Sequence, residues 1–376
     1  MSLNRKRALT ALLMIGVLGV GSTGSASPVA AVSGDIVVGP AGCGDVGYVT
    51  DGVADNVQIQ AAVDAAGDGD VVAICAGRYE YSDDVQWSEA SADLVIRGAG
   101  AGATILDGND AWNILAIYAD NLRIEVRDIT LIDGNAGWGS ALLLFDSGAP
   151  SSAVLRDVRI LSNDNQISVG AVAVENGTVE AYGSLFEGNR APESGGAIYA
   201  SEGIYVENSR FIDNEAGFNG GALYLNNNFS KVEIVRSTFT RNRAGVTGDG
   251  WGGVAYAYAI DARDSSFVGN QADHGGALAA YAGWLDGAPA GYAITRNIFR
   301  SNSASEGSEL YLWVYDETTL KGIRANRFIG ASRKSAIYLA NDEEGGPDSA
   351  DGSLKLAARR LAGKNALGSR AIEIGN

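Results

Sequence analysis

The chain contains little histidine, cysteine, methionine or proline: its 376 residues include one His, two Cys, two Met and six Pro. The single histidine, His274, lies far along the chain from the two cysteines, Cys43 and Cys75, so the close ligand spacing of a typical zinc site is missing and we expect no metal and no other cofactor. Basic residues are also scarce, and the formal net charge is −17. Such a surface repels phosphate backbones and anionic lipids, which argues against nucleic acid and membrane surfaces as partners.

Long hydrophobic runs are missing beyond the first 31 residues. This segment carries the basic run Arg5–Arg7, then the apolar stretch Ala8–Val20, then two small-residue cleavage motifs that end at Ala26 and Ala31. That order is typical of an export signal, and the apolar stretch is too short to span a bilayer comfortably. An uncleaved anchor is the alternative. The sequence therefore predicts a signal peptide over 1–31 and no transmembrane segment after cleavage. It predicts an exported protein that is extracellular or at the cell surface, with the periplasm as another location.

Helical periodicity is absent from most of the chain, and a repeat takes its place. A Phe followed three residues later by Asn recurs at spacings of 25–32 residues, and each copy precedes a Gly-Gly-Ala-aliphatic run or a degenerate form of it, such as Gly307-Ser-Glu-Leu310. The copies pair Phe186 with Asn189, Phe211 with Asn214, Phe239 with Asn242, Phe267 with Asn270, and Phe299 with Asn302. Weaker versions begin at Ile132 and Ile160, and Phe328 follows without its Asn. A fixed period of this length indicates stacked supersecondary units.

Short alternating runs such as Val232–Val235 lie around these motifs and are bounded by Gly and Asn. Period-2 alternation of this length predicts strands, and no run between repeats is long enough for a crossover helix. Each repeat is therefore expected to form one coil. The predicted class is all-β, a right-handed single-stranded parallel β-helix whose coils occupy residues 71–340.

In such coils, equivalent positions stack about 4.8 Å apart. The repeated Phe residues, preceded by Ile132 and Ile160, are expected to form one buried column. The Asn residues, from Asn163 onward, are expected to form a ladder in which each side-chain amide bonds the next, at a turn that needs a residue tolerant of positive φ. The Gly-Gly pair suits a tight corner where backbones approach closely.

Residues 32–70 are expected to form an N-terminal extension and a capping helix. The helix is predicted from Asp55 to Ala66, with Asp55 and Gln58 as a capping box and Gly67 just past the end. Its apolar residues share one face: Ile59, Ala62, Val63 and Ala66. Such a helix would cover the open end of the β-helix, whose unpaired backbone groups invite aggregation.

Two further features concern the ends of the chain. Cys43 and Cys75 are an isolated pair, and in an exported protein such a pair is most simply a disulfide; two buried free thiols are the alternative. Residues 341–376 begin with a Gly- and acid-rich break. After it, Leu354–Leu356 and Ala371–Ile374 could form the last coils.

The linked motifs resemble the repeats of the polymorphic outer membrane protein family, which carry the same two tetrapeptides. That resemblance covers Ile132 to Leu339 and implies a β-helix in a surface protein. Residues 50–130 resemble the N-terminal part of pectin-lyase-like β-helix proteins, with a helix, a Gly-Asp-Gly-Asp turn, a strand and a later strand ending in Asp-Gly. The second resemblance implies the pectin-lyase-like fold and a carbohydrate-active enzyme, a polysaccharide lyase or a glycoside hydrolase, as one alternative.

Catalysis on polysaccharides needs carboxylates, or a base beside Ca²⁺, gathered from adjacent coils. The columns that flank the Phe positions gather no neighbouring carboxylates, and the Asn-Thr-Asp and Gly-His-Gly motifs of polygalacturonases are absent. No catalytic residue is assigned. The preferred hypothesis is therefore a non-catalytic contact module, adhesin-like or glycan-binding, whose partner is a polysaccharide or a cell-surface glycan.

One constellation suits such a contact. The expanded corner Gly245–Trp251 lies one coil before Asp273-His274, so Asp249, Trp251, Asp273 and His274 are expected to share a small binding patch. They would supply acids, a base and a stacking surface for a sugar ring; a solvated loop with no function is the alternative. A contact role predicts a shallow patch whose carboxylates and imidazole lie too far apart to act on one bond.

Overall fold

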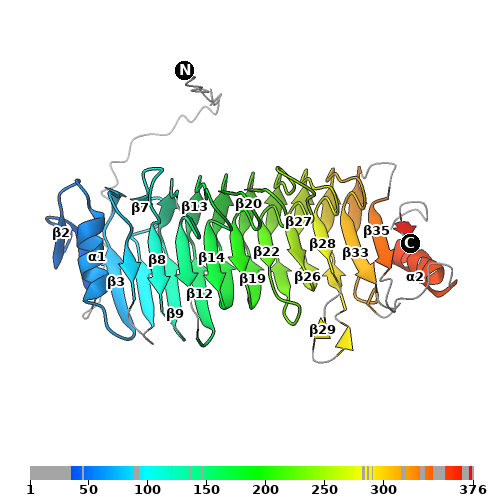
Figure 1. Cartoon of the computed structure of the whole chain (residues 1–376), viewed down its shortest axis with the longest axis horizontal. Helices are drawn as coiled ribbons and strands as arrows, with labels where there is room; N and C mark the ends of the chain where they lie inside the picture. Colours follow the sequence, from blue (N-terminus) through cyan, green and yellow to red (C-terminus); the bar gives the residue numbers. More distant parts are fainter. Residues whose placement is uncertain are drawn as a thin grey trace, which may run out of the picture.

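The computed structural model shows a β-solenoid of about nine coils, with nearly all strands parallel and a short helix near the N-terminal end (Figure 1). The predicted fold class is confirmed. The signal peptide predicted over 1–31 lies outside the described residues, and among these no helix is long and apolar enough to cross a membrane. The structure describes residues 35–44, 46–88, 93–119, 121–135, 137–145, 148–281, 284–285, 288–289, 291–314, 319–330, 335–341, 352–365 and 372–374.

Three parallel sheets run along the solenoid, and each full coil gives one strand to each sheet. In stacking order, sheet A contains β2 (Tyr48–Thr50), β1 (Ile36–Pro40), β3 (Asp70–Ile74), β6 (Leu94–Arg97), β9 (Arg123–Arg127), β12 (Ser151–Arg156), β15 (Gly177–Tyr182), β19 (Gly203–Glu207), β23 (Val232–Val235), β26 (Ile260–Arg263) and β31 (Ala293–Thr295). Sheet B contains β4 (Gly77–Glu80), β7 (Thr104–Asp107), β10 (Thr130–Ile132), β13 (Arg159–Leu161), β16 (Leu185–Glu187), β20 (Arg210–Ile212), β24 (Thr238–Thr240), β27 (Ser266–Val268), β32 (Ile298–Arg300) and β34 (Arg327–Ile329).

Sheet C contains β5 (Gln86–Trp87), β8 (Leu115–Tyr118), β11 (Leu142–Phe145), β14 (Val172–Glu175), β18 (Ile198–Ala200), β22 (Leu223–Leu225), β25 (Ala255–Ala257), β28 (Leu278–Ala280), β33 (Leu310–Val314), β35 (Ile337–Asn341) and β36 (Ile372–Ile374). Two small pairs lie outside these sheets. One is the parallel pair β17 (Arg190–Ala191) and β21 (Glu215–Ala216), and the other is the antiparallel pair β29 (Trp284–Leu285) and β30 (Ala288–Pro289).

The phenylalanine column lies on the inner face of sheet B. Successive rings from Phe186 to Phe328 stack with centroids 4.5–5.2 Å apart and planes within 12° of parallel. The predicted start of the column is wrong by one residue, because Leu131, and not Ile132, pairs with Ile160 and is fully buried. Without a Phe to mark the motif, the two adjacent apolar residues of β10 could not be told apart from the sequence.

The asparagine ladder runs parallel to this column, and its six members, Asn163 to Asn302, are at most 3 % exposed. In each step the side-chain nitrogen donates to the next carboxamide oxygen, as from Asn214 to Asn242 at 2.9 Å. The same oxygen also accepts the backbone N–H of Asn214 at 3.1 Å. The positive φ that was expected at the Asn lies one residue earlier, for example at Asp213 and Arg241.

We expect Asn214→Ala to lower the free energy of unfolding by about 1–3 kcal/mol, because buried donors and acceptors on two coils lose their partners. Chemical denaturation measures the change. Asn228→Ala, in an exposed turn, is the control and should change stability by less than about 0.5 kcal/mol. Equal effects of the two substitutions would contradict the ladder's role.

A second polar ladder, which was not predicted, lies two residues before each Phe of the column and continues at Asn365, which no Phe follows. It runs through Ser184, Ser209, Ser237, Ser265, Asn297, Asn326 and Asn365, all at most 4 % exposed. In each step the side-chain oxygen accepts the backbone N–H of the preceding member, as Ser237 does from Ser209 at 3.1 Å. The sequence signal was the recurring Ser-x-Phe tripeptide.

The first ladder ends on a buried acid. Position 331, where the next Asn would stand, is Ala, and the Glu309 side chain accepts from both the side chain and the backbone N–H of Asn302 instead. Glu309 is fully buried, and its second carboxyl oxygen has no hydrogen-bond partner among the described residues. Burial raises the pKa of Glu309 to about 8, so the group holds its proton inside the fold at neutral pH.

At the N-terminal end, the extension forms more than a helix. Strands β1 and β2 continue sheet A beyond the first coil, and helix α1 (Asn56–Asp64) packs against both. The predicted apolar face of the helix is buried. The predicted capping box does not form, because Asp55 accepts the backbone N–H of Gly52 rather than capping the helix. Gly67 lies two residues beyond the C-cap, Ala65, so it does not end the helix as predicted.

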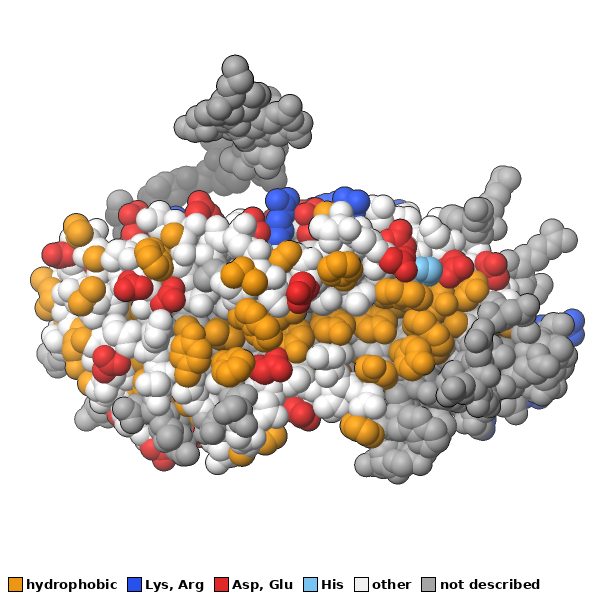
Figure 2. All heavy atoms as spheres, viewed as in Figure 1, with side chains coloured by type: hydrophobic (Ala, Val, Ile, Leu, Met, Phe, Trp, Pro, Cys, Tyr) orange, Lys and Arg blue, Asp and Glu red, His pale blue; other side chains and the backbone are white. Residues whose placement is uncertain are grey.

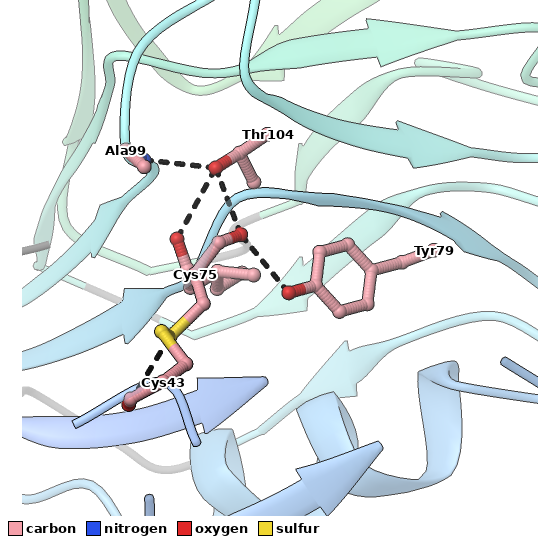
Figure 3. Close-up of a disulfide and its surroundings, with 6 residues drawn as sticks. Cys43, Cys75, Tyr79, Ala99 and Thr104 are labelled. Atoms are coloured by element: carbon pink, nitrogen blue, oxygen red, sulfur yellow. Dashed lines mark hydrogen bonds between the residues drawn. A yellow bond between two sulfur atoms is a disulfide. The ribbon is translucent and has the colours of Figure 1, made fainter. Parts of the chain in front are cut away.

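A disulfide joins this extension to the solenoid: Cys43 is bonded to Cys75, which directly follows β3, and their Cα atoms are 6.4 Å apart (Figure 3). The carbonyl of Cys75 accepts hydrogen bonds from the hydroxyls of Tyr79 at 2.9 Å and Thr104 at 3.0 Å. The disulfide therefore fixes the extension to Cys75, whose carbonyl is also bonded by side chains of β4 and β7 in sheet B.

One prediction for the C-terminal end is wrong. Leu354–Leu356 belongs to helix α2 (Gly352–Lys364) and not to a strand, whereas Ile372–Ile374 does form a strand, β36, on β35. Leu361 of α2 is buried in the main core, and Asn365 ends the second polar ladder. Both ends of the solenoid thus carry a helix (Figure 1).

Candidate functional site

The predicted patch lies on the corner that precedes sheet C. Trp251, His274 and Glu306 occupy equivalent positions on three successive coils and form bridges to one another. Each stands directly before a Gly of positive φ, so the backbone turns there and the side chain projects outward. The structure therefore adds Glu306, which the sequence analysis did not include, to the patch.

His274 lies at the centre. Its ring stacks on the indole of Trp251, with centroids 3.8 Å apart and planes within 16°. Its Nε2 lies 3.1 Å from a carboxylate oxygen of Asp249, and its Nδ1 lies 2.9 Å from one of Glu306. A carboxylate can only accept hydrogen bonds, so both contacts are satisfied at once when the ring carries both protons.

This geometry corrects one expectation. The carboxylates and the imidazole were expected to lie far apart, yet Asp249 and His274 are in direct contact. Neither ring nitrogen is free, however, since each faces a carboxylate. A general base needs a nitrogen that can reach the proton it removes, and this arrangement offers none.

Asp273, the fourth predicted residue, has a structural contact. Its carboxylate accepts the backbone N–H of Gly250 at 2.9 Å and so holds the expanded corner against the next coil. The corner loop is thereby anchored twice, by Asp273 at Gly250 and by His274 at Asp249. Within the described residues, no group of three or more His, Cys, Asp and Glu side chains is placed to hold a metal ion.

Further aromatic side chains surround Trp251. The ring of Tyr311 meets its edge at 4.9 Å, and the indole of Trp313 lies at 4.8 Å. Both come from β33. Tyr281 contacts Trp313 in turn at 4.8 Å. Trp251 is the ring of this cluster that was predicted from the sequence, and the structure adds Tyr311, Trp313 and Tyr281.

The cluster is one end of a longer band of rings on the outer face of sheet C. Ring contacts of 4.7–6.5 Å connect Tyr118, Phe145, Trp138, Tyr199, Tyr224, Tyr256, Trp251, Tyr311 and Tyr338 without a break. We call these nine residues the aromatic band. Figure 2 shows an apolar stripe that runs along the solenoid and ends beside the histidine.

Two tryptophans keep the band continuous. The tyrosine position of sheet C holds Ala173 on β14 and Ala279 on β28, in register with Tyr199 and Tyr311 of the next coils. Trp138 and Trp251 stand on the coils before these alanines, and their indoles reach Tyr199 and Tyr311. The sequence signal that would have revealed the band is the tyrosine after Gly-Gly-Ala-aliphatic, as in Tyr224.

The hydroxyls of the band are uncharged near neutral pH. Burial raises the pKa of Tyr199 to about 12 and also raises the pKa values of Tyr224, Tyr256 and Tyr311. Tyr224, Tyr256 and Tyr338 are half-buried, whereas Tyr199 and Tyr311 are only 5 % and 6 % exposed. The band therefore presents partly covered rings together with neutral hydroxyl groups. This combination suits a ligand that has both apolar faces and hydroxyl groups.

Comparison with known protein families gives one match. Residues 183–201 match the Chlamydia polymorphic membrane protein repeat, and this segment contains the Phe186–Asn189 motif and the following Gly-Gly-Ala run. No curated relative and no solved structure matches the chain. The match supports a β-solenoid with repeats of this type and indicates a surface or outer-membrane-associated protein. The resemblance to pectin-lyase-like proteins stays a prediction.

Proposed function

We propose that this protein is a non-catalytic contact module that binds a glycan chain along the aromatic band of sheet C. The observation that carries the proposal is the unbroken series of ring contacts from Tyr118 to Tyr338. The series crosses nine strands of sheet C, from β8 to β35, and at about 4.8 Å per coil its length is on the order of 40 Å. A ligand that uses all of it has to be extended.

The band lies on the face of a sheet whose inner strands are hydrogen-bonded on both sides. It offers no free backbone groups, so its contacts must come from rings and hydroxyls. Stacking on aromatic side chains suits the apolar faces of sugar rings, and tyrosine hydroxyls suit their hydroxyl groups. Residues on the outer surface of a repeat scaffold are also the usual place for binding.

The alternative is an enzyme that acts on polysaccharides, for which the Asp249–His274 contact is the relevant observation. Hydrolysis needs two carboxyl groups that face each other across the scissile bond, about 5–9.5 Å apart. Here Asp249 and Glu306 both face the imidazole. We therefore expect binding without turnover, and we expect Asp249→Ala and His274→Ala to change binding only.

A glycan panel followed by calorimetry tests the proposal. We expect Tyr224→Ala to weaken binding about tenfold, because truncation of a central aromatic contact typically costs more than 1 kcal/mol. Tyr205→Ala is the matched control, since Tyr205 is a half-buried outward tyrosine of sheet A and its loss should leave binding unchanged.

Two results would contradict the proposal. One is the absence of binding to every glycan in the panel. The other is turnover of a polysaccharide, measured as new reducing ends or unsaturated uronates, that disappears in Asp249→Ala.

A further inference from the structure

Acidic side chains border the aromatic band in the described part of the chain (Figure 2). Carboxylates lie near enough to its tyrosines to raise their pKa values. Besides burial, Glu175 raises the pKa of Tyr199, Glu193 that of Tyr224, and Glu306 those of Tyr311 and Tyr338. At its end, the side chains of Asp249 and Glu306 are 67 % and 39 % exposed, whereas the imidazole between them is 18 % exposed. The two acids can therefore reach a ligand, while the imidazole that both contact is largely covered.

Among the described residues, the Lys or Arg side chain stacked over a ring is Arg156, and it covers Tyr182 on sheet A, not a ring of the band. In Figure 2, the basic side chains visible on this face lie away from the apolar stripe, and acidic ones border it. In the part of the chain that the structure describes, a ligand on the band thus meets carboxylates and aromatic rings, and no Lys or Arg side chain stacks on a ring of the band.

Rings and carboxylates together recognise cations. An ammonium group gains from the face of an aromatic ring and forms charge-assisted hydrogen bonds with carboxylates. A uronate, sulfate or phosphate group would instead face like charges, which disfavour its approach. Acidic polysaccharides are therefore poor ligands for this surface.

We propose that the ligand of the aromatic band is a glycan chain with free amino groups, a polymer of glycosamine type. This inference rests on the proposed function, since it names the ligand class of the same surface. A lysine-rich peptide would also carry positive charges that complement the carboxylates beside the band. Extended peptides, however, normally gain affinity from main-chain hydrogen bonds at a free sheet edge, and the band runs over paired strands.

The test compares three 1,4-linked oligosaccharides of equal length by calorimetry at about pH 5.5, where an amine is protonated: glucosamine, N-acetylglucosamine and galacturonate. We expect glucosamine oligomers to bind at least tenfold more tightly than the acetylated ones, and galacturonate oligomers not to bind. Tyr224→Ala should weaken the binding of both amino sugars.

The double variant Asp249→Asn, Glu306→Gln should remove most of the preference for the free amine and keep the binding of the acetylated oligomer. The control Glu233→Gln, Asp261→Asn removes two acids from the outer face of sheet A and should keep the preference. This comparison separates recognition at the band from general attraction to an acidic protein.

Each other outcome overturns the inference. Equal binding of amino and acetylated oligomers that depends on Tyr224, or tighter binding of galacturonate, would contradict it and leave the glycan-binding function standing. Binding of oligolysine that depends on Tyr224, without binding of glucosamine, would identify a cationic peptide instead. No binding by any of these ligands would overturn both proposals.

Discussion

Phe211→Ala is expected to lower the free energy of unfolding by about 3–5 kcal/mol, the usual cost of truncating a buried aromatic residue. Phe211 is fully buried and lies between Phe186 and Phe239, with ring centroids 4.5 Å and 4.8 Å away. Its loss leaves a cavity that the neighbouring rings cannot fill, because their strands are held in register on both sides. Denaturant titration measures the change.

Phe229→Ala is the matched control for this substitution. Phe229 is 67 % exposed in a turn of the same part of the solenoid, so its truncation should change stability by less than about 0.5 kcal/mol. Similar stability of the two variants would show that the Phe column does not form the core.

Glu309→Gln is expected to raise stability at pH 8 by a few kcal/mol. The folded pKa of about 8 lies above the ordinary value of 4.5, so between these values the unfolded chain has lost the proton that the folded chain keeps. Stability from this group is therefore present below about pH 4.5 and is lost as the pH rises towards 8, by about 1.4 kcal/mol for each unit of pKa difference. Glutamine keeps the neutral shape and the acceptor for Asn302, and it removes this loss.

Thermal unfolding of both proteins from pH 4 to pH 9 checks the expectation. The difference between Glu309→Gln and the natural protein should be small at the acidic end and grow with pH. Glu187→Gln, which changes an exposed carboxyl on β16, should follow the natural protein. A constant difference across the range would show that Glu309 ionises normally in the fold.

The repeat alone predicted the fold because its chemistry recurs at a fixed period. The Phe and Asn residues mark one inner position and one turn on every coil, and stacking then fixes the rest of the register. The prediction failed where the repeated Phe or Asn was missing. At Ile132 the register slipped by one residue, and Leu354–Leu356, a short apolar–polar–apolar run, was read as a strand when it lies in a helix. A run of three residues does not distinguish the two periods.

The candidate site was only partly predictable for a different reason. Trp251 and His274 could be placed together because they share one column of the repeat, and Glu306 continues that column. The aromatic band crosses from this column to the tyrosine column of sheet C, and such a link depends on how far a side chain reaches. Trp251, for example, contacts Tyr311, which lies two coils further along the solenoid. Comparing equivalent positions of the repeats does not reveal contacts between side chains of different columns.

The central claim, that a glycan lies along the outer face of sheet C, is tested most directly by oxidative footprinting of the protein with and without the bound glycan. Tyr224, Tyr256, Trp251 and Tyr338 should lose reactivity together in the complex. Tyr182 and Tyr205, whose rings contact each other on sheet A with centroids 5.5 Å apart, should react equally in both states. Protection of the sheet A pair, or protection at one end of the band without the rest, would contradict the account.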